Sequence, residues 1–558
     1  MIRIRIPAML VALALLLPLQ RLVTQSSFPA AAVDSVFAAY NRTDRPGCAV
    51  GVYRNGRVAY ARGYGMADLN QGIAISPKTV FYIASTSKQF TAASIMLLVT
   101  QGKISLDDPV RKYVPELPAY ADAVTLRHLV HHLSGLRDYL GLWGISGRLG
   151  GDEIPEEAAL DLIVRQKALD FTPGSHWAYS NSNYFLLSVI VRRVSGQSLR
   201  DYSTRNLFEP LGMQDTHFHD DRTMIVPRRA EGYEPTGAGG YRIVRTSFAL
   251  VGDGGLHTTV EDLAKWDENF FSNTVGGGAS FVQRLYTRGI LTTGDTTEYA
   301  AGLFLKPYRG LPTVSHGGSF IGYRAELLRF PSMHTSIGIL CNDYTADPSA
   351  MAQAVANVVL RAAFAKAAAP SAAVQSGAAA RAPTTQRAPD SYLGRFEFLP
   401  GVAASVERAS TGLTMKAMGR DWALTALNDS TYAADGLPGT LAFRRLANGR
   451  TGLMASSTMD APAPPLLPVP VLSAADRAHV IGSYFSEELQ ATYVVKERDG
   501  RLMVRGGYGD WMPMEPFQPD QFSTGEAKAT VLRDKSGKVT ALVLDAARMK
   551  NIQLVRVR

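Results

Sequence analysis

Cysteine is scarce in this chain: Cys48 and Cys341 are the only two in 558 residues. This scarcity excludes a small disulfide-built scaffold, which needs several bridges to make up for a weak hydrophobic core. Both cysteines lie in apolar runs typical of buried strands, so we expect two buried thiols. Export would also permit a bridge between them, and this alternative stays open.

Clustered charge of one sign is also missing. The chain has 58 Lys and Arg residues against 49 Asp and Glu residues, which gives a formal charge of +9. The basic residues are scattered, without a basic block interleaved with aromatic residues, so we expect no nucleic-acid partner. Hydrophobic residues make up 46% and charged residues 19% of the chain, as in folded globular proteins. The length predicts two to four domains.

The sequence has no hydrophobic run long enough to predict a membrane span with assurance. The apolar run at residues 6–19 follows Arg3 and Arg5, which is typical of a secretory signal. We therefore expect residues 1–26 to be a signal peptide and the protein to be periplasmic or secreted, with no stable membrane insertion. The alternative is an uncleaved N-terminal segment that tethers the protein to the membrane.

The motifs of several enzyme classes are missing: the Gly-x-Ser-x-Gly elbow, the Walker loop and the dinucleotide fingerprint. The chain instead has Ser85 and Lys88 ahead of an apolar run at residues 90–99. Residues at i and i+3 share a helix face. A lysine buried among apolar residues has a lowered pKa, so its neutral amine can take the proton of the serine and make a nucleophile. The short pattern also arises by chance, so other residues must decide.

The first two thirds of the chain predict a layered α+β domain. Its helical patterns lie between two groups of strand signals, one near each end of the region. A sheet contributed by both ends, with helices between them, is typical of α+β or α/β layered domains, and we place this domain at residues 27–365. The strand signals lie at 48–54, 58–63, 313–315, 323–330 and 335–341, and the helical patterns at 87–101, 156–166 and 183–194.

The last third of the chain predicts all-β structure. Residues 366–389 are rich in Ala and Pro and lack the periodicity needed to bury a face, which predicts a linker. Short alternating strands with turn signals follow, and the motif at 392–396 recurs at 480–484. We therefore expect two copies of one small antiparallel β-barrel. The copies lie at 390–460 and 473–558, with a proline-rich linker at 461–472.

Tyr179 and Asn181 stand between Pro173-Gly174 and a helical pattern, so they project from a short loop. A tyrosine can shuttle a proton if positive neighbours lower its pKa, and an asparagine amide can hold a substrate carbonyl or the lysine. The alternative is a helix cap with a packed aromatic residue.

His316-Gly317-Gly318-Ser319 lies between two strand signals. Two glycines suit a place where the backbone approaches another molecule closely. In a catalytic interpretation, the backbone at Gly318 and Ser319 pairs with substrate, the Ser319 N–H joins that of Ser85 as an oxyanion hole, and His316 supplies a polar or cationic side chain. The alternative is a glycine turn with an incidental histidine.

In this order, the elements at 85–88, 179–181 and 316–318 resemble the three signatures of the serine β-lactamase and penicillin-binding-protein superfamily. The resemblance is closest to its branch of class C β-lactamases, D-alanyl-D-alanine carboxypeptidases and esterases. It implies an α/β sandwich, with helices on both faces of an antiparallel sheet, and no cofactor or metal. Further matching segments lie at 102–110, 124–129, 134–136 and 254–263, so the resemblance runs from about residue 33 to 363.

The resemblance implies roles for individual residues. Ser85 is the acylated nucleophile, Lys88 its activating base and Tyr179 the proton shuttle, while Asn181 contacts the substrate amide. His316 takes the place of the lysine in the Lys-Thr-Gly element of class C β-lactamases. Histidine is mostly neutral at pH 7 and shorter than lysine, so it is a poorer partner for the carboxylate of β-lactam antibiotics.

The doubled β tail is similar to the D-aminopeptidase architecture, in which a barrel loop enters the active-site cleft and selects substrates with a free amino end. Residues 505–512 are one candidate for such a loop, and a surface turn is the alternative. Domain layout alone does not establish a substrate.

His128, His131 and His132 form a cluster at helical spacing, and one interpretation of such a cluster is a set of metal ligands. The cluster lies where the family has a Ser-His-Thr-Ser-Gly-like turn, so we expect a structural role.

These observations predict an exported serine hydrolase that works through an acyl-enzyme. Its expected substrates are small D-configured peptides or amides, which would make it a D-stereospecific peptidase, aminopeptidase or amidase. The alternatives are a carboxylesterase, a weak β-lactamase or DD-carboxypeptidase, and a non-catalytic sensor of the penicillin-binding type. The sequence leaves the oligomeric state open.

Overall fold

The computed structural model describes ten stretches of the chain. They are residues 28–148, 154–237, 239–245, 249–368, 390–410, 412–434, 440–455, 463–525, 527–546 and 548–557. The predicted signal segment at 1–26 and most of the predicted linker at 366–389 lie outside these residues.

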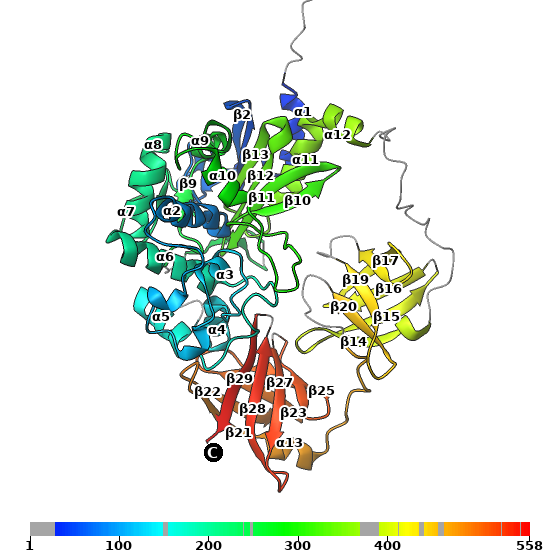
Figure 1. The fold of residues 1–558 in the computed structure, drawn as a ribbon. Helices are drawn as coiled ribbons and strands as arrows, with labels where there is room; N and C mark the ends of the chain where they lie inside the picture. The colour runs from blue at the N-terminus through cyan, green and yellow to red at the C-terminus, as the bar shows by residue number, and fades with distance from the viewer. Residues whose placement is uncertain are drawn as a thin grey trace, which may run out of the picture.

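A six-stranded antiparallel sheet forms the centre of the first domain (Figure 1). Its order, β10-β11-β12-β13-β1-β2, joins the two ends of the domain in one sheet, as the strand signals predict. The turn at Asn55-Gly56 joins β1 to β2, and both residues have positive φ. The strands are β1 (Cys48–Arg54), β2 (Arg57–Tyr64), β10 (Phe304–Tyr308), β11 (Leu311–Phe320), β12 (Tyr323–Phe330) and β13 (Thr335–Cys341).

Helices cover both faces of this sheet. On one face α1 (Ala30–Val36), α11 (Pro348–Val359) and α12 (Arg361–Ala368) enclose one apolar cluster with β1 and β13. On the other face α9 (Val260–Ser272) contacts β1, β2 and β13, within a larger core that includes the remaining helices. The antiparallel sheet between two helical layers confirms the predicted fold class.

The expectation of two free thiols is wrong, because Cys48 and Cys341 form a disulfide. The two cysteines are 293 residues apart in sequence, yet they lie directly opposite each other in the β1–β13 register. Both are fully buried. The bond therefore connects the first and last strands of the central sheet.

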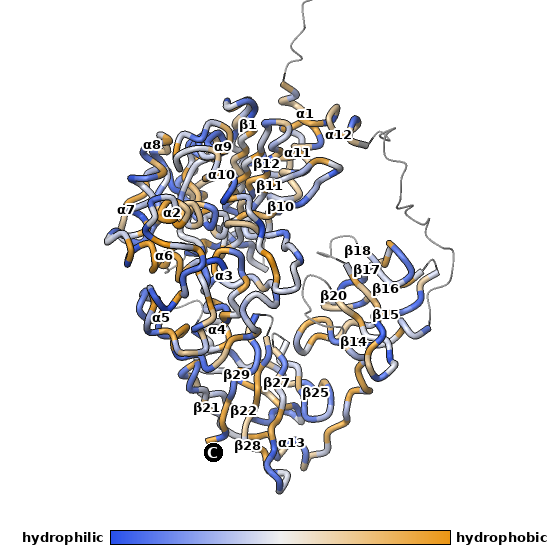
Figure 2. The backbone as a smooth tube through the Cα atoms, in the orientation of Figure 1, coloured by the Kyte–Doolittle hydropathy of each residue, from blue (hydrophilic) through white to orange (hydrophobic). Residues whose placement is uncertain are grey.

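Two helices carry Lys88 and Asn181, two of the residues that the sequence places in the site. Helix α2 (Lys88–Thr100) is buried from Lys88 through Leu98, and Figure 2 shows it as largely hydrophobic. A 3₁₀ turn, η2 (Ala84–Ser87), precedes it and holds Ser85, so the predicted helix begins with a tighter turn. Helix α6 (Asn181–Ser195) packs against α2 and ends at Gly196, which has a positive φ of 72°. The third predicted helix is α5 (Glu156–Val164).

Short elements complete the first domain. The helices are α3 (Leu126–Val130), α4 (Tyr139–Ile145), α7 (Leu199–Ser203), α8 (Glu209–Leu211) and α10 (Ala279–Tyr286). The strands are β3 (Met66–Asp68), β4 (Ile73–Ala74), β5 (Phe81–Tyr82), β6 (His217–Phe218), β7 (Tyr233–Pro235), β8 (Tyr241–Ile243) and β9 (Leu256–Thr258). Of these, β5, β9 and β6 form a three-stranded sheet beside η2. No helix in the described ranges is long and apolar enough to cross a membrane.

The tail consists of two antiparallel barrel-like sheets, as predicted (Figure 1). In the first, seven strands follow chain order, and β14 also contacts β20. They are β14 (Gly394–Leu399), β15 (Val402–Ala409), β16 (Gly412–Ala417), β17 (Arg420–Ala426), β18 (Thr431–Ala434), β19 (Leu441–Arg445) and β20 (Thr451–Ala455).

The second sheet has nine strands in the order β24-β23-β22-β21-β29-β28-β27-β26-β25, and α13 (Ala474–Val480) precedes it. The strands are β21 (Gly482–Ser486), β22 (Ala491–Arg498), β23 (Arg501–Gly506), β24 (Met512–Pro513), β25 (Glu515–Gln518), β26 (Gln521–Ser523), β27 (Ala527–Arg533), β28 (Val539–Ala546) and β29 (Met549–Arg556). This second barrel packs against the first domain near α4 (Figure 1).

Candidate active site

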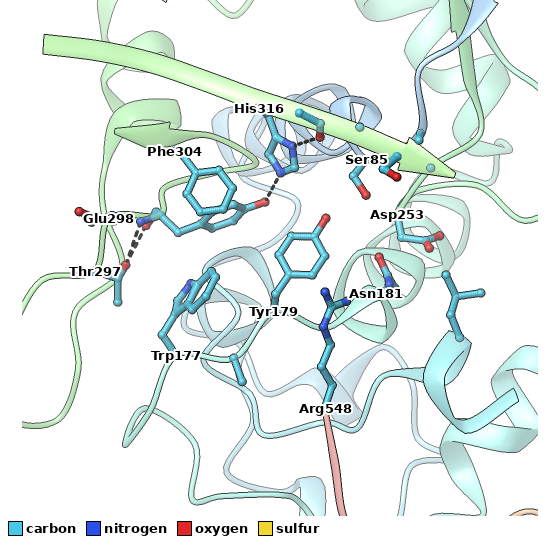
Figure 3. Close-up of a pocket in the computed structure, with 18 of the residues that line it drawn as sticks. Ser85, Trp177, Tyr179, Asn181, Asp253, Thr297, Glu298, Phe304, His316 and Arg548 are labelled. Atoms are coloured by element: carbon cyan, nitrogen blue, oxygen red, sulfur yellow. Dashed lines mark hydrogen bonds between the residues drawn. The ribbon is translucent and has the colours of Figure 1, made fainter. Parts of the chain in front are cut away.

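Residues of all three domains line one cavity of about 1580 Å³. Its lining includes Ser85 and strand β11 of the first domain, Met454 of the first barrel and Arg548 of the second barrel. Figure 3 shows Ser85, Tyr179, Asn181 and Arg548 converging on one space below β11. Seven of the eight residues that the sequence places in the site line this cavity, and the eighth, Lys88, is buried in α2.

Ser85 and Lys88 are in direct contact at the start of α2. The Lys88 Nζ donates to Ser85 Oγ at 3.0 Å and to Asn181 Oδ1 at 2.9 Å, and it also contacts the main-chain oxygen of Asp253. Ala84, just before the serine, has a positive φ of 46°. Such a conformation is costly for a residue with a Cβ and is typical of functional sites. The 3₁₀ turn therefore presents Ser85 to the cavity with Lys88 beneath it.

The electrostatics of Lys88 suit a base. Its side chain is completely buried, and burial lowers its pKa to about 8. This value of about 8 is the balance between burial and the charge of Arg548, which lower the pKa, and the carboxylates of Asp253 and Asp138, which raise it. A substantial fraction of the amine is therefore neutral near pH 8 and can accept the proton of Ser85.

Tyr179 lies over the Ser85–Lys88 pair, with the Lys88 Nζ 4.8 Å from the centre of its ring. The sequence makes a proton shuttle at this position conditional on positive neighbours that lower its pKa. Burial instead raises this pKa, although a hydrogen bond with Ser85 and the charge of Arg548 oppose the effect. Tyr179 is therefore protonated at neutral pH, and its hydroxyl can donate a proton.

Asn181 is the first residue of α6, and one carboxylate fixes its position. The Asp138 Oδ2 accepts from the Asn181 backbone N–H at 2.7 Å and from its side-chain Nδ2 at 2.8 Å. With Nδ2 held in this way, Oδ1 points to Lys88. The amide therefore positions the lysine, as well as facing the cavity in Figure 3.

His316 on β11 is held as a neutral imidazole. Its Nδ1 lies 2.7 Å from the Gly317 carbonyl, which can only accept, so Nδ1 carries the proton. Its Nε2 then accepts from the Tyr299 hydroxyl at 3.1 Å. Burial lowers the pKa of His316 to about 3, and the charge of Lys88 adds to the effect. The histidine therefore supplies no cation at this position, as its residue type predicts.

Gly318 explains the glycine pair. A Cβ at this position would lie 2.1 Å from the Ile83 carbonyl oxygen and 2.9 Å from Thr86 Oγ1. Strand β11 can therefore lie directly against the turn that holds Ser85. This contact places the backbone of Ser319 beside the same turn.

Three functional residues were missed from the sequence: Asp138, Asp253 and Arg548. Asp138 caps α4 through Gly141 N in addition to binding Asn181, and Asp253 accepts from the Tyr139 hydroxyl at 3.1 Å. Asp253 directly precedes the Gly254-Gly255 segment of the resemblance. Arg548 gave no signal, because it stands in one of many turns between barrel strands.

Arg548 enters the cavity from the turn between β28 and β29. Its guanidinium carbon lies 5.0 Å from the centre of the Tyr179 ring, and its Nη1 lies 3.7 Å from Asp138 Oδ2. The loop at 505–512, the candidate named from the sequence, packs elsewhere. A Cβ on Gly147 would lie 2.2 Å from Gly509 N, so this loop contacts the end of α4.

The histidine cluster at 128–132 is used for packing. Both ring nitrogens of His131 lie 3.0 Å from main-chain carbonyl oxygens, and His128 accepts from the Thr125 N–H at the start of α3. His132 contacts the Tyr179 ring, with centroids 4.3 Å apart.

Comparison with known proteins identifies the family of this chain. The family model described as Beta-lactamase matches residues 33–360, more than half of the chain. The chain belongs to the β-lactamase family. With D-aminopeptidases among its relatives, this protein is a serine hydrolase of that family.

Its curated relatives include a D-aminopeptidase of Cereibacter sphaeroides, 28% identical over 92% of this chain and 96% of the relative. Penicillin-binding protein 4* of Bacillus subtilis is 28% identical over 51% of this chain and 66% of that protein. Among solved structures, the octameric penicillin-binding protein homologue of Pyrococcus abyssi is similar in fold. It has a TM-score of 0.55 and 22% identity, covering 86% of this chain and 98% of that one.

Proposed function

We propose that this family member hydrolyses amide bonds of small D-configured peptides through an acyl-enzyme on Ser85. The observation that carries the proposal is the buried Lys88 amine, 3.0 Å from Ser85 Oγ, with Tyr179 over both. The D-aminopeptidase that matches nearly the whole chain supports the substrate class. An exported location would suit such substrates and rests on the N-terminal sequence alone.

In the proposed acylation, neutral Lys88 takes the Ser85 proton as Oγ attacks the substrate carbonyl. The N–H groups of Ser85 and Ser319 stabilise the oxyanion, since β11 lies against η2. The protonated Tyr179 gives its proton to the leaving amine and regains one from Lys88. In deacylation, water attacks the ester, and the same groups carry its proton back to Ser85.

Arg548 favours a second candidate, a carboxypeptidase that acts on peptides with a free carboxylate. It brings a guanidinium into a cavity where His316 is neutral, and guanidinium groups bind carboxylates with two parallel hydrogen bonds. A substrate carboxylate next to Arg548 would replace the long contact with Asp138.

A panel assay tests both candidates. The purified protein is given D-alanine amide, a D-Ala-D-Ala peptide, its C-terminally amidated counterpart, a chromogenic cephalosporin and a short acyl ester. Turnover of D-amides that disappears in Ser85→Ala, with an acyl adduct on Ser85 by mass spectrometry, is expected. Turnover that survives in Ser85→Ala would exclude the proposed nucleophile, and no turnover of any substrate without an adduct would exclude the enzyme.

Arg548→Gln separates the two substrate classes. A carboxypeptidase would lose roughly 10-fold or more in kcat/KM on the free peptide relative to the amidated one, because one charged hydrogen-bond partner is lost. Arg501→Gln, at an exposed arginine of the same barrel, is the matched control. An equal change on both peptides would remove the argument for a carboxylate.

A further inference from the structure

Three histidines meet on the small sheet beside the active site: His217, His219 and His257. His217 belongs to β6, His219 follows two positions later, and His257 lies in β9. Alternate residues of a strand point to one face. His217 and His257 are register partners across β6 and β9, so their side chains also share a face. The pairing of two strands distant in sequence therefore collects three imidazoles.

The distances fit a common metal ion. One nitrogen from each ring lies within 4.8 Å of the other two, and His217 Nε2 is 3.4 Å from His219 Nδ1. Two nitrogens bound to one tetrahedral zinc at about 2.0–2.1 Å are themselves roughly 3.4 Å apart. The closest pair therefore already has the separation of two ligands, and the nitrogen of the third ring lies within 4.8 Å of both.

The imidazoles are in the state that a metal requires. His219 and His257 are buried, and burial lowers the pKa of all three histidines, to about 4 for His219. Neutral imidazole is the metal-binding form. Among the described residues, His257 Nδ1 has no hydrogen-bond partner, although it is buried. A buried polar atom without a partner is costly, and a ligand would satisfy it.

We propose that His217, His219 and His257 bind one Zn²⁺ ion. Three imidazoles with an open fourth position are a known zinc ligand set, and nitrogen ligands select zinc over magnesium or calcium. Nothing in the proposed acyl-enzyme chemistry uses these histidines, so the site is separate from it.

The charged residues around the cluster partly offset one another. Arg200 and Arg229 also lower the pKa of His219, so two cations are near the cluster. Arg200 is paired with Asp220 at 2.7 Å, which offsets its charge. Asp221, whose charge raises the pKa of His219, opposes Arg229, which remains a repulsive charge that lowers the affinity for the ion.

The position of the cluster gives the ion a structural role. His257 is the register partner of Tyr82 on its other side, and Tyr82 lines the active-site cavity. The Ile83 N–H, two residues before Ser85, donates to the Leu256 carbonyl oxygen of β9. A metal that joins β6 to β9 therefore stiffens the sheet that supports the nucleophile turn and the Asp253 carbonyl.

Metal titration of the full-length protein tests the site. After treatment with a chelator, the protein is titrated with Zn²⁺ by calorimetry and with Co²⁺ by visible absorption. We expect one Zn²⁺ per chain, a rise in Tm with Zn²⁺, and the intense visible bands of tetrahedral, nitrogen-bound Co²⁺. His217→Gln, at the most exposed of the three, weakens Kd by at least about 10-fold and abolishes the rise in Tm.

Matched variants assign the binding. His479→Gln, at an exposed histidine of the second barrel, and Ser85→Ala keep the Zn²⁺ affinity of the wild type. Absence of bound Zn²⁺, or equal affinity in His217→Gln and wild type, would overturn the proposal. If His217→Gln fails to fold, the wild-type Co²⁺ spectrum decides alone, and a spectrum without tetrahedral nitrogen ligation overturns the site.

Discussion

At the residue scale, the proposed chemistry depends on one buried amine, that of Lys88. Lys88 contacts Ser85, Asn181 and the Asp253 carbonyl oxygen, and it has no exposed surface. Its burial disfavours the charged form, whereas Asp253 and Asp138 favour it. The balance of these opposing effects decides the pH at which the proposed base is active.

The first prediction concerns this pH. Lys88 must be neutral to accept a proton, so kcat/KM is expected to rise with pH through an apparent pKa near 8. Arg548→Gln removes a positive charge that lowers the Lys88 pKa, so the rising limb moves to higher pH. Initial rates between pH 5.5 and about 10 measure the limb. A limb that stays in place in Arg548→Gln, with Arg501→Gln as control, contradicts this coupling.

The second prediction concerns Glu326, a buried carboxyl on β12 next to Gly317. Burial raises its pKa to about 7, while Ser349 donates to it at 2.6 Å. The folded state holds this proton more tightly than the unfolded state does. The contribution of the proton to the free energy of unfolding is therefore complete below the unfolded pKa near 4.5 and is lost as pH rises through about 7. Glu326→Gln cannot ionise and is expected to be more stable than wild type above pH 8, by about 2 kcal/mol.

Urea unfolding at pH 5 and pH 8.5 measures the difference between Glu326→Gln and wild type. The two proteins are expected to differ less at pH 5, where Glu326 is protonated in the folded state, than at pH 8.5, where it is ionised. A variant that is equally destabilised at both pH values would show that Glu326 is not the titrating group.

At the scale of elements, one short helix joins the proposed catalytic residues to the second barrel. Asp138 at the start of α4 holds Asn181 with Oδ2 and caps the helix with Oδ1. The β28–β29 turn lies against the same helix, and a Cβ on Gly141 would meet Met549 Cε at 2.7 Å. Asp138 also contacts Arg548, whose Nη1 lies 3.7 Å from its Oδ2. The capping of α4 and the placement of Arg548 therefore both depend on Asp138.

The third prediction tests Asp138. In Asp138→Asn, the oxygen can still cap α4, but the new NH₂ group faces the two donors of Asn181. Asn181 then loses its fixed orientation towards Lys88, and kcat is expected to fall roughly 10–100-fold. Ser198→Ala removes the cap of α7, through Asp201 N, away from the cavity. This control should cost about 1 kcal/mol of stability and leave kcat unchanged; an unchanged kcat in Asp138→Asn would contradict the positioning role.

At the scale of the whole molecule, a buried arginine fixes the second barrel to the first domain. Arg137 donates to Glu488 Oε1 at 2.5 Å and to the Lys550 carbonyl oxygen at 2.7 Å, and it contacts Asp170 at 3.3 Å. Glu488 also accepts from the Lys167 N–H at 2.8 Å. This interface holds β29 at the depth that brings Arg548 into the cavity.

The fourth prediction tests the interface. Glu488→Ala leaves the Arg137 guanidinium buried with less compensation, so stability is expected to fall by about 3 kcal/mol. The neighbouring Glu487→Ala removes an exposed pair with Lys167 and should change stability by less than about 1 kcal/mol. Urea midpoints compare the two variants. If Arg548 is displaced, the rising limb of the pH profile moves as in Arg548→Gln; equal midpoints for both variants would contradict a role for Arg137 in docking.

The sequence by itself determined the features that depend on residue type and on the spacing of nearby residues. Ser85 and Lys88 are one turn apart, so their contact follows from helix geometry. The order of strand and helix patterns gave the layered domain, and the turn signals and repeat gave the two barrels. The neutrality of His316 was already indicated by its residue type.

Only the tertiary structure decided which distant residues meet. The disulfide depends on the β1–β13 register, which pairs residues 293 positions apart. Arg548 reaches the site through the docking of a barrel, and the three-histidine cluster through the pairing of β6 with β9. The raised pKa of Tyr179 comes from burial, which outweighs its positive neighbours. Register, docking and burial are properties of the packed chain, and no local pattern of residues encodes them.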